Sequence, residues 1–440
     1  MAETALNSGD TAWVLTSAAL VLLMLPGLAL FYGGMTRGKS VLNMLMMVMG
    51  ALCLVGILWV LYGYSMTFGA GGPFVSSPFQ LFGLEGLMTD DAQASLPVMA
   101  FVAFQAMFAA ITVALIAGAI ADRTKFSAWL VFGAFWATLV YFPVAHWVWS
   151  ADGWIFRGQG PLGGVPAIDF AGGTAVHVNA GAAGLALALI LGNRLGWPKT
   201  PMKPHNLPLV MLGAGLLWFG WFGFNAGSAL AANNTAAVVF VNTFAATCAA
   251  AAGWLLTERI RDGHATSLGA ASGIVAGLVA ITPSCSAVSP LGALALGLVA
   301  GVLCALAVGL KYRFGYDDSL DVVGVHLVGG LVGTILIGFL ATDAAPAGVD
   351  GLLYGGGLGQ LRSQTIAALT VLAYSFGVAG VIGLLIKKTM GLRIAEDDEV
   401  AGIDTAVHAE AAYELGQSGG GGAFGGVGQH TLRSKEEVSA

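Results

Sequence analysis

Residues 169–184 read DFAGGTAVHVNAGAAG, so that Asp169 precedes the lone histidine His177 inside a long apolar segment. A second histidine, His326, lies in the similar stretch DVVGVHLVGGLVG, residues 321–333. Ionisable groups inside membrane segments are costly and rare, and they commonly mark ion or proton paths. We therefore expect both histidines to face one pore.

The composition is that of a polytopic membrane protein. Hydrophobic residues make up 57% of the 440 residues and charged residues 10%, whereas about 25% of a soluble domain is charged. Many of the 65 glycines fall inside apolar segments, where small residues let helices approach closely. The net charge of −6 gives no indication of nucleic-acid binding.

Eleven apolar segments are long enough to cross a bilayer, which takes about 20 residues each. We expect an all-α fold, because lipid offers the backbone no other hydrogen-bond partners. The segments lie near 11–34, 41–69, 98–120, 127–149, 169–192, 208–228, 231–256, 268–285, 290–310, 322–342 and 364–386.

The basic residues predict the orientation of the chain. Of the 18 Lys and Arg residues, all but Arg157 and Arg362 lie in the tail or in loops on one side of the predicted spans. Positive residues favour the cytoplasmic side. The N-terminus is therefore predicted outside and the C-terminus in the cytoplasm, in a plasma membrane such as the bacterial inner membrane.

The two histidine segments are the fifth and tenth predicted spans. An odd offset means that the two segments run in opposite directions, as in inverted-repeat transporters. A weaker similarity pairs GLALFYGG, 27–34, with GWFGFNAG, 220–227. The sequence thus predicts an inverted five-helix repeat, spans 1–5 and 6–10, plus one extra helix.

The composition changes after the last span. We predict a transmembrane domain over 1–388, a polar cytoplasmic tail over 389–415, and a Gly-rich flexible extension over 416–440.

The histidines allow three interpretations. A lone histidine in an apolar helix is often a satisfied packing group, but two at equivalent sites favour function. Paired imidazoles can hydrogen-bond each other and pass a proton along the pore. Axial ligation of haem is a weaker alternative, because no cofactor motif accompanies the pair. We expect no cofactor, no metal and no enzymatic activity.

Aromatic residues gather in the predicted outer halves of the spans. Phe104 and Phe108 are four positions apart, which places them on one helix face. Such residues often fill cores or form interface belts. Alternatively, they could form a cation–π cage over a gate, in which each ring would stabilise a bound cation by about 0.5–2 kcal/mol. The candidates are Phe104, Phe108, Trp149, Trp221 and Phe224, with Ser228 as a hydroxyl acceptor.

The sequence resembles the Amt/Mep/Rh ammonium transporters, in particular the bacterial and plant Amt branch, over roughly residues 11–413. The resemblance implies eleven helices around a pore in each subunit of a homotrimer. The motifs that carry it are DFAGGTAVHVNAGAAG (169–184), GWFGFNAGSA (220–229), DVVGVHLVGG (321–330), FQAMF (104–108) and PHNLP (204–208).

The resemblance also implies roles for single residues. Phe108, Trp149 and Ser228 match an outer recruitment site, and Asp169 matches an acid that shapes it. Phe108 and Phe224 match a stacked phenyl gate, and His177 and His326 a twin-histidine pair. Trp221 matches a pore-lining aromatic, and Thr282 a residue of the lower pore.

The tail resembles a docking element for trimeric PII signal proteins. This sequence departs from that pattern in two places: Ala409 replaces the usual glycine, and the Gly-rich extension goes beyond the common form. Both departures concern the docking of a PII protein and leave the expectation of transport unchanged. The matching residues are Gly402, Asp404, His408, Glu410, Ala412 and Tyr413.

The implied substrate is ammonium, with methylammonium as an analogue, crossing the lipid bilayer as ammonia. The favoured interpretation is electrogenic, with the proton carried separately along the histidines. The alternatives are an electroneutral channel for ammonia or carbon dioxide, and an ammonium sensor that acts through the tail.

Overall fold

A computed structural model describes residues 6–89 and 95–413. The predicted Gly-rich extension, 416–440, lies outside these residues. Helices account for all the regular elements of the described part, with no strand among them. The prediction of an all-α membrane protein is therefore confirmed.

Sixteen α-helices follow one another along the described chain. They are α1 (Ser8–Met35), α2 (Val41–Leu58), α3 (Tyr64–Phe68), α4 (Val98–Ile116), α5 (Phe126–Trp136), α6 (Phe142–Trp149), α7 (Asn179–Leu191), α8 (Leu207–Gly227), α9 (Asn234–Asp262), α10 (Ser267–Ile281), α11 (Pro290–Ala307), α12 (Leu310–Phe314), α13 (Val328–Leu340), α14 (Gly359–Thr389), α15 (Glu396–Ala401) and α16 (Ile403–His408).

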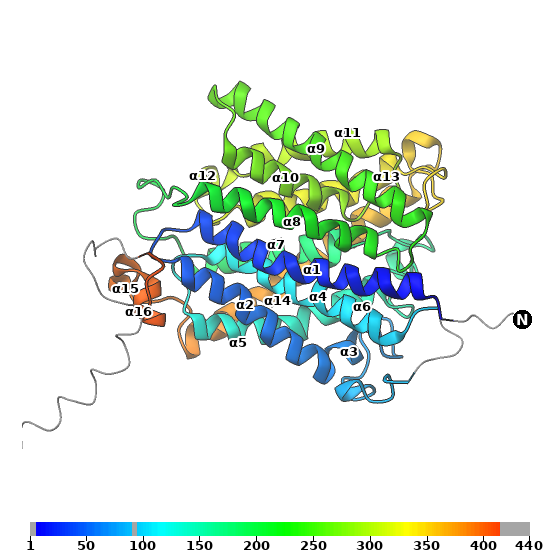
Figure 1. Ribbon diagram of the computed structural model, residues 1–440, viewed down its shortest axis with the longest axis horizontal. Helices are drawn as coiled ribbons and strands as arrows, with labels where there is room; N and C mark the ends of the chain where they lie inside the picture. The colour runs from blue at the N-terminus through cyan, green and yellow to red at the C-terminus, as the bar shows by residue number, and fades with distance from the viewer. Residues whose placement is uncertain (1–5, 90–94, 414–440) are drawn as a thin grey trace, which may run out of the picture.

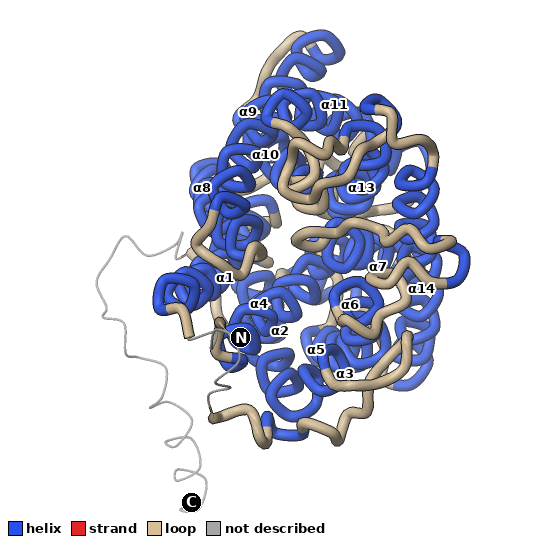
Figure 2. Tube along the Cα trace, turned by 90° about the vertical axis from the view of Figure 1, so that its right-hand side faces the viewer, coloured by secondary structure: helices blue, strands red, loops and turns tan. Residues whose placement is uncertain are grey.

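The long helices lie side by side in one bundle (Figure 1). The short helices α15 and α16 sit at one end of it, which we call the tail end, and α1 begins at the opposite end. Seen end-on in Figure 2, α1 and α8 lie along one side of the bundle and α14 along the other, with α4 and α7 between them.

Within the described residues, ten apolar helical stretches are long enough to cross a membrane. The predicted segment 268–285 corresponds to α10, an apolar helix of 15 residues. The chain is thus a multi-pass membrane protein, while the count of eleven spans stays a prediction.

Each histidine stretch begins with a short π-helical turn. Gly173–Val178 carries His177 and leads into α7, and Val323–Leu327 carries His326 and leads into α13. Such turns widen a helix locally and are frequent at functional sites. The two histidines therefore share a local backbone geometry as well as a similar sequence.

Glycines bring α9 and α11 into close contact. A Cβ atom at Gly297 would overlap the carbonyl oxygen of Ala246, and one at Gly301 would overlap that of Ala250. Because helices in lipid associate mainly through such packing, these two glycines fix the separation of α9 and α11.

We expect Gly301→Val to lower the stability of the protein in detergent by about 1–3 kcal/mol, because the new side chain forces the two helices apart. Gly377→Val is the matched control, since a Cβ at Gly377 has open space around it. Thermal unfolding of both variants tests this, and equal midpoints would contradict it.

Candidate functional site

The two histidines lie against each other at the centre of the bundle. Their Nδ1 atoms are 3.2 Å apart, and the ring centroids are 5.3 Å apart with an angle of 23° between the planes. Both side chains are buried. A neutral imidazole has one N–H, so one Nδ1 donates and the other accepts.

A small cavity lies beside the histidines. Its free volume is about 10 Å³, close to the space that one water-sized molecule needs. Three of its lining side chains carry polar atoms: the two histidines, and Trp221, whose N–H is donated to Thr282. His177 Nε2 has no hydrogen-bond partner in the described residues. The other lining residues are Met24, Leu28, Phe31, Ile111, Leu115, Val176, Leu217, Phe224 and Val275.

Two phenyl rings separate this cavity from a wider one. Phe108 of α4 and Phe224 of α8 stack with centroids 4.1 Å apart and an angle of 17° between the planes. Phe224 also lies 6.2 Å from the His177 ring. Both phenylalanines are buried. Phe224 lines the histidine cavity, and Phe108 lines the wider one.

The wider cavity, which we call the vestibule, has a volume of about 590 Å³. Phe104 and Trp149 pack edge-on against Phe108 at 4.8 and 5.8 Å. Ser228 also lines it, and its hydroxyl donates to the carbonyl oxygen of Phe224 at 2.9 Å. The vestibule therefore brings together residues that the sequence singled out from four separate segments.

Gln105 also lines the vestibule and was missed by the sequence analysis. It is a polar residue within an apolar span, between two aromatic candidates. That position was a usable signal, because a buried amide needs a polar partner or a polar cavity.

Asp169, which lines the vestibule, caps the start of the helix that carries His177. Its carboxylate accepts hydrogen bonds from the backbone N–H groups of Gly172, Gly173, Thr174 and Ala175. It thus satisfies the donors at the start of the His177 helix and adds a favourable negative charge there. Its backbone oxygen accepts from the Trp149 indole at 2.9 Å.

Asp318 caps the start of the helix that carries the second histidine, His326. It lies eight residues before His326, as Asp169 lies eight before His177, and it accepts from the N–H groups of Val322 and Val323 at 3.1 and 2.7 Å. The sequence analysis missed Asp318, although the equal Asp-to-His spacing was present in both stretches.

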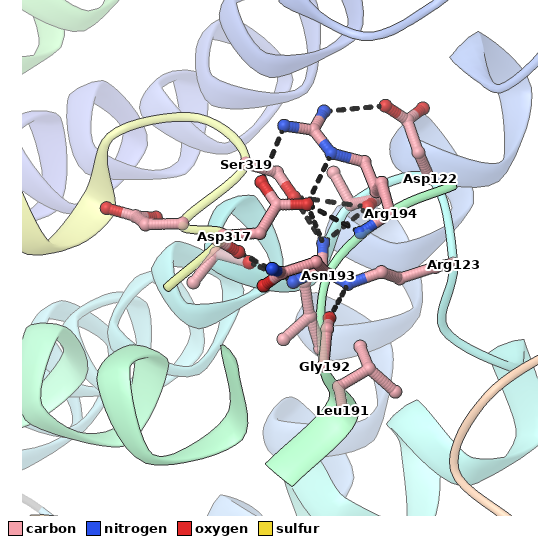
Figure 3. Close-up of polar contacts among 12 residues, drawn as sticks. Asp122, Arg123, Leu191, Gly192, Asn193, Arg194, Asp317 and Ser319 are labelled. Atoms are coloured by element: carbon pink, nitrogen blue, oxygen red, sulfur yellow. Dashed lines mark hydrogen bonds and ion pairs between the residues drawn. The ribbon is translucent and has the colours of Figure 1, made fainter. Parts of the chain in front are cut away.

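A buried charge cluster joins the two histidine segments at the tail end of the bundle (Figure 3). Arg194, just after α7, donates to both oxygens of Asp317 at 2.9 and 2.8 Å, and to Asp122 at 3.1 Å. Arg123 donates to the Asp317 backbone oxygen at 2.6 Å. Because Asp317 precedes Asp318, the end of one histidine segment lies beside the start of the other. The two segments run antiparallel.

The arginines set the charge state of this cluster. Burial alone would raise the pKa of Asp317, but hydrogen bonds from Arg194 and the charges of Arg123 and Arg194 lower it overall. Asp317 is thus held as a carboxylate, and its pairing compensates the buried arginines.

Trp221 lies flat against His177. The ring centroids are 5.4 Å apart with an angle of 18°, and the indole Nε1 donates to the Thr282 hydroxyl at 2.8 Å. Thr282 is buried but does not line the histidine cavity. Its place in the lower pore stays a prediction.

The tail packs on the loops at its end of the bundle. The Asp404 carboxylate accepts from the N–H groups of Leu42 and Asn43 at 3.0 and 2.8 Å, and so caps α2. His408 Nε2 lies 3.1 Å from Asn43 Oδ1. Gly402, at φ 128°, lies where a Cβ would crowd Lys39.

Of the other three tail candidates, Glu410 and Tyr413 are exposed and Ala412 is half-buried. The Tyr413 hydroxyl lies 2.9 Å from His205 Nε2. The Glu410 side chain faces solvent.

A multi-pass helical bundle with a buried histidine pair beside a cavity defines a membrane protein with a candidate conduction path. The chain belongs to the Ammonium Transporter Family, whose model matches residues 12–413.

Named relatives match over nearly their whole length. An ammonium transporter of Mycobacterium tuberculosis is 59% identical over 438 residues, covering 94% of this chain and 92% of the relative. Ammonium transporter Amt1 of Archaeoglobus fulgidus is 42% identical over 410 residues, covering 93% and 100%. The predicted family resemblance is confirmed.

Solved structures share the fold. The crystal structure of Candida albicans Mep2 matches with a TM-score of 0.81 and 33% identity, covering 89% of this chain and 88% of that chain. A sensor Amt protein matches with a TM-score of 0.83 and 29% identity, covering 90% and 98%.

We expect Asp169→Asn to destabilise the protein by about 2–4 kcal/mol, because the substituted amide cannot replace a carboxylate that accepts several N–H groups. The control is Asp152→Asn, since the exposed Asp152–Arg157 pair contributes less than about 1 kcal/mol. Thermal unfolding in detergent is the measurement, and similar losses in the two variants would contradict the capping role.

Proposed function

We propose that this protein transports ammonium. The cation binds in the vestibule against Phe104, Phe108 and Trp149, loses its proton, and crosses the Phe108–Phe224 gate as ammonia along the histidines. The observation that carries the proposal is the hydrogen-bonded His177–His326 pair beside an otherwise apolar cavity of one-molecule size.

Removing the proton from ammonium costs less free energy than moving the ion through an apolar pore. An unpaired ammonium ion in an apolar pore loses its hydration, which costs tens of kcal/mol in the limit of a low dielectric. For an amine with a pKa of about 10.4, deprotonation at pH 7 costs roughly 4–5 kcal/mol. The neutral molecule is therefore the species suited to this cavity.

The vestibule suits the cation. Three aromatic rings line it, and a cation over the face of such a ring gains about 0.5–2 kcal/mol. The Ser228 oxygen adds a hydrogen-bond acceptor, and Asp169 supports the site indirectly by holding Trp149.

The proton is carried separately along the imidazole pair. One Nδ1 already donates to the other, so a proton taken up at one ring can be released from the next as the shared hydrogen bond reverses. Transport is then electrogenic. An electroneutral ammonia channel, in which the proton returns to its original side, is the competing mechanism.

We also propose the arrangement that the resemblance implies for the whole protein: spans 1–5 and 6–10 as inverted halves, with span 11 added, in a homotrimer with the N-terminus outside. The matched Asp-to-His spacings and the antiparallel histidine segments support the inverted halves. The basic residues at the tail end support a cytoplasmic C-terminus.

The tail is proposed as a regulatory element and a PII-binding surface. Its supports are the capping of α2 by Asp404 and the contact of His408 with Asn43, which tie its position to the start of α2. A PII protein that moved the tail would act on this end of α2.

We expect His177→Ala and His326→Ala each to reduce uptake of labelled methylammonium into proteoliposomes by at least about tenfold, or to admit potassium, because the cavity loses its polar groups. The control is His264→Ala, an exposed loop residue, which should transport as the wild type does. Unchanged uptake and selectivity in both pore variants would contradict the proposal.

A further inference from the structure

The Trp221 indole presents its face, and not its donor, to the histidines. Its N–H is used by the Thr282 hydroxyl at 2.8 Å, while its ring lies nearly parallel to that of His177. Trp221 therefore contributes an apolar wall to the histidine cavity.

A buried chain of hydrogen bonds holds Thr282 in place. Its hydroxyl has one hydrogen, which is within reach of the Leu278 carbonyl oxygen at 2.7 Å and of Asn225 Oδ1 at 3.2 Å and is donated to one of them at a time. Asn225 Nδ2 donates to the Thr243 hydroxyl at 3.0 Å, and Thr243 donates to the Val239 carbonyl at 2.7 Å. The side chains of Asn225, Thr243 and Thr282 are fully buried.

This chain connects three helices behind the pore wall. Trp221 and Asn225 lie one turn apart on α8, Thr243 lies on α9, and Thr282 directly follows α10. A buried hydroxyl or amide costs free energy unless it is paired, so each link stabilises the orientation of the next.

Releasing the indole would change what the cavity offers. His177 Nε2 is buried and has no hydrogen-bond partner in the described part of the chain. An indole N–H freed from Thr282 would be an unpaired donor beside this unpaired nitrogen. If the indole turned toward His177, its N–H would bind Nε2, the atom that a conducted molecule needs as its hydrogen-bond partner.

We propose that Thr282, held by Asn225, is a positioning residue that keeps the Trp221 donor out of the pore. Among the side chains that line this cavity, the histidines then remain the groups that exchange hydrogen bonds with a small neutral amine. This inference rests on the proposed function and specifies how the same cavity keeps its selectivity for a small neutral amine.

Thr282→Val tests the proposal, because valine keeps the shape of threonine and removes the hydroxyl. We expect methylammonium uptake into proteoliposomes to fall about tenfold, the scale of one unpaired buried donor. Thr282→Ser, which restores the hydroxyl, should recover most of the uptake. Thr247→Val is the matched control, since the buried Thr247 hydroxyl donates only to the Thr243 backbone oxygen.

Fluorine NMR of protein labelled with 5-fluorotryptophan reports on the indole itself. The Trp221 signal is identified by its loss in Trp221→Phe, and it should shift in Thr282→Val but not in Thr282→Ser or Thr247→Val. The proposal is overturned if the signal stays in place in Thr282→Val, or if Thr247→Val lowers uptake equally.

The same experiments separate this inference from the proposed function. Absence of uptake by the wild-type protein would reject ammonium transport, while the NMR signal would still report whether Thr282 orients Trp221. Uptake by the wild type with no change in Thr282→Val would reject the positioning role alone.

Discussion

The hydrogen bond between His177 and His326 depends on where two antiparallel helices are held. At the start of each, an aspartate accepts backbone N–H groups, Asp169 on one and Asp318 on the other. At the tail end, the Arg194–Asp317 pair ties the end of the first segment to the start of the second (Figure 3). A shift of either helix by one residue, about 1.5 Å, would break a 3.2 Å contact between rings.

The low dielectric of the bundle explains why so much polar structure surrounds so small a cavity. Pairing a buried charge or N–H is favourable, because an unpaired one costs several kcal/mol. Arg194 and Asp317 are paired with each other, and the Trp221 N–H is paired with Thr282. His177 Nε2 is one of several buried polar atoms without a partner in the described residues, and it is the one whose side chain lines the histidine cavity.

The sequence predicted the parts of the structure that follow from composition and local pattern. The all-helical membrane fold and the family are confirmed. The candidates Phe104, Phe108, Trp149 and Ser228 line one vestibule, and the histidines lie together behind it, although their roles stay predictions. The sequence analysis missed contacts between distant segments. Arg194 and Asp317 were readable only as loop charges, and the position of Thr282 depends on how α10 meets α8. Neither pairing has a local sequence signal.

The central claim is that ammonium arrives as a cation and that its proton crosses apart from ammonia. The most direct test is the current that an ammonium pulse evokes in proteoliposomes, recorded together with internal pH. We expect a current that saturates with ammonium and is absent with potassium, and that His177→Ala either abolishes or makes unselective. Internal alkalinisation without a current would contradict separate proton transfer, and no response beyond that of protein-free liposomes would contradict transport itself.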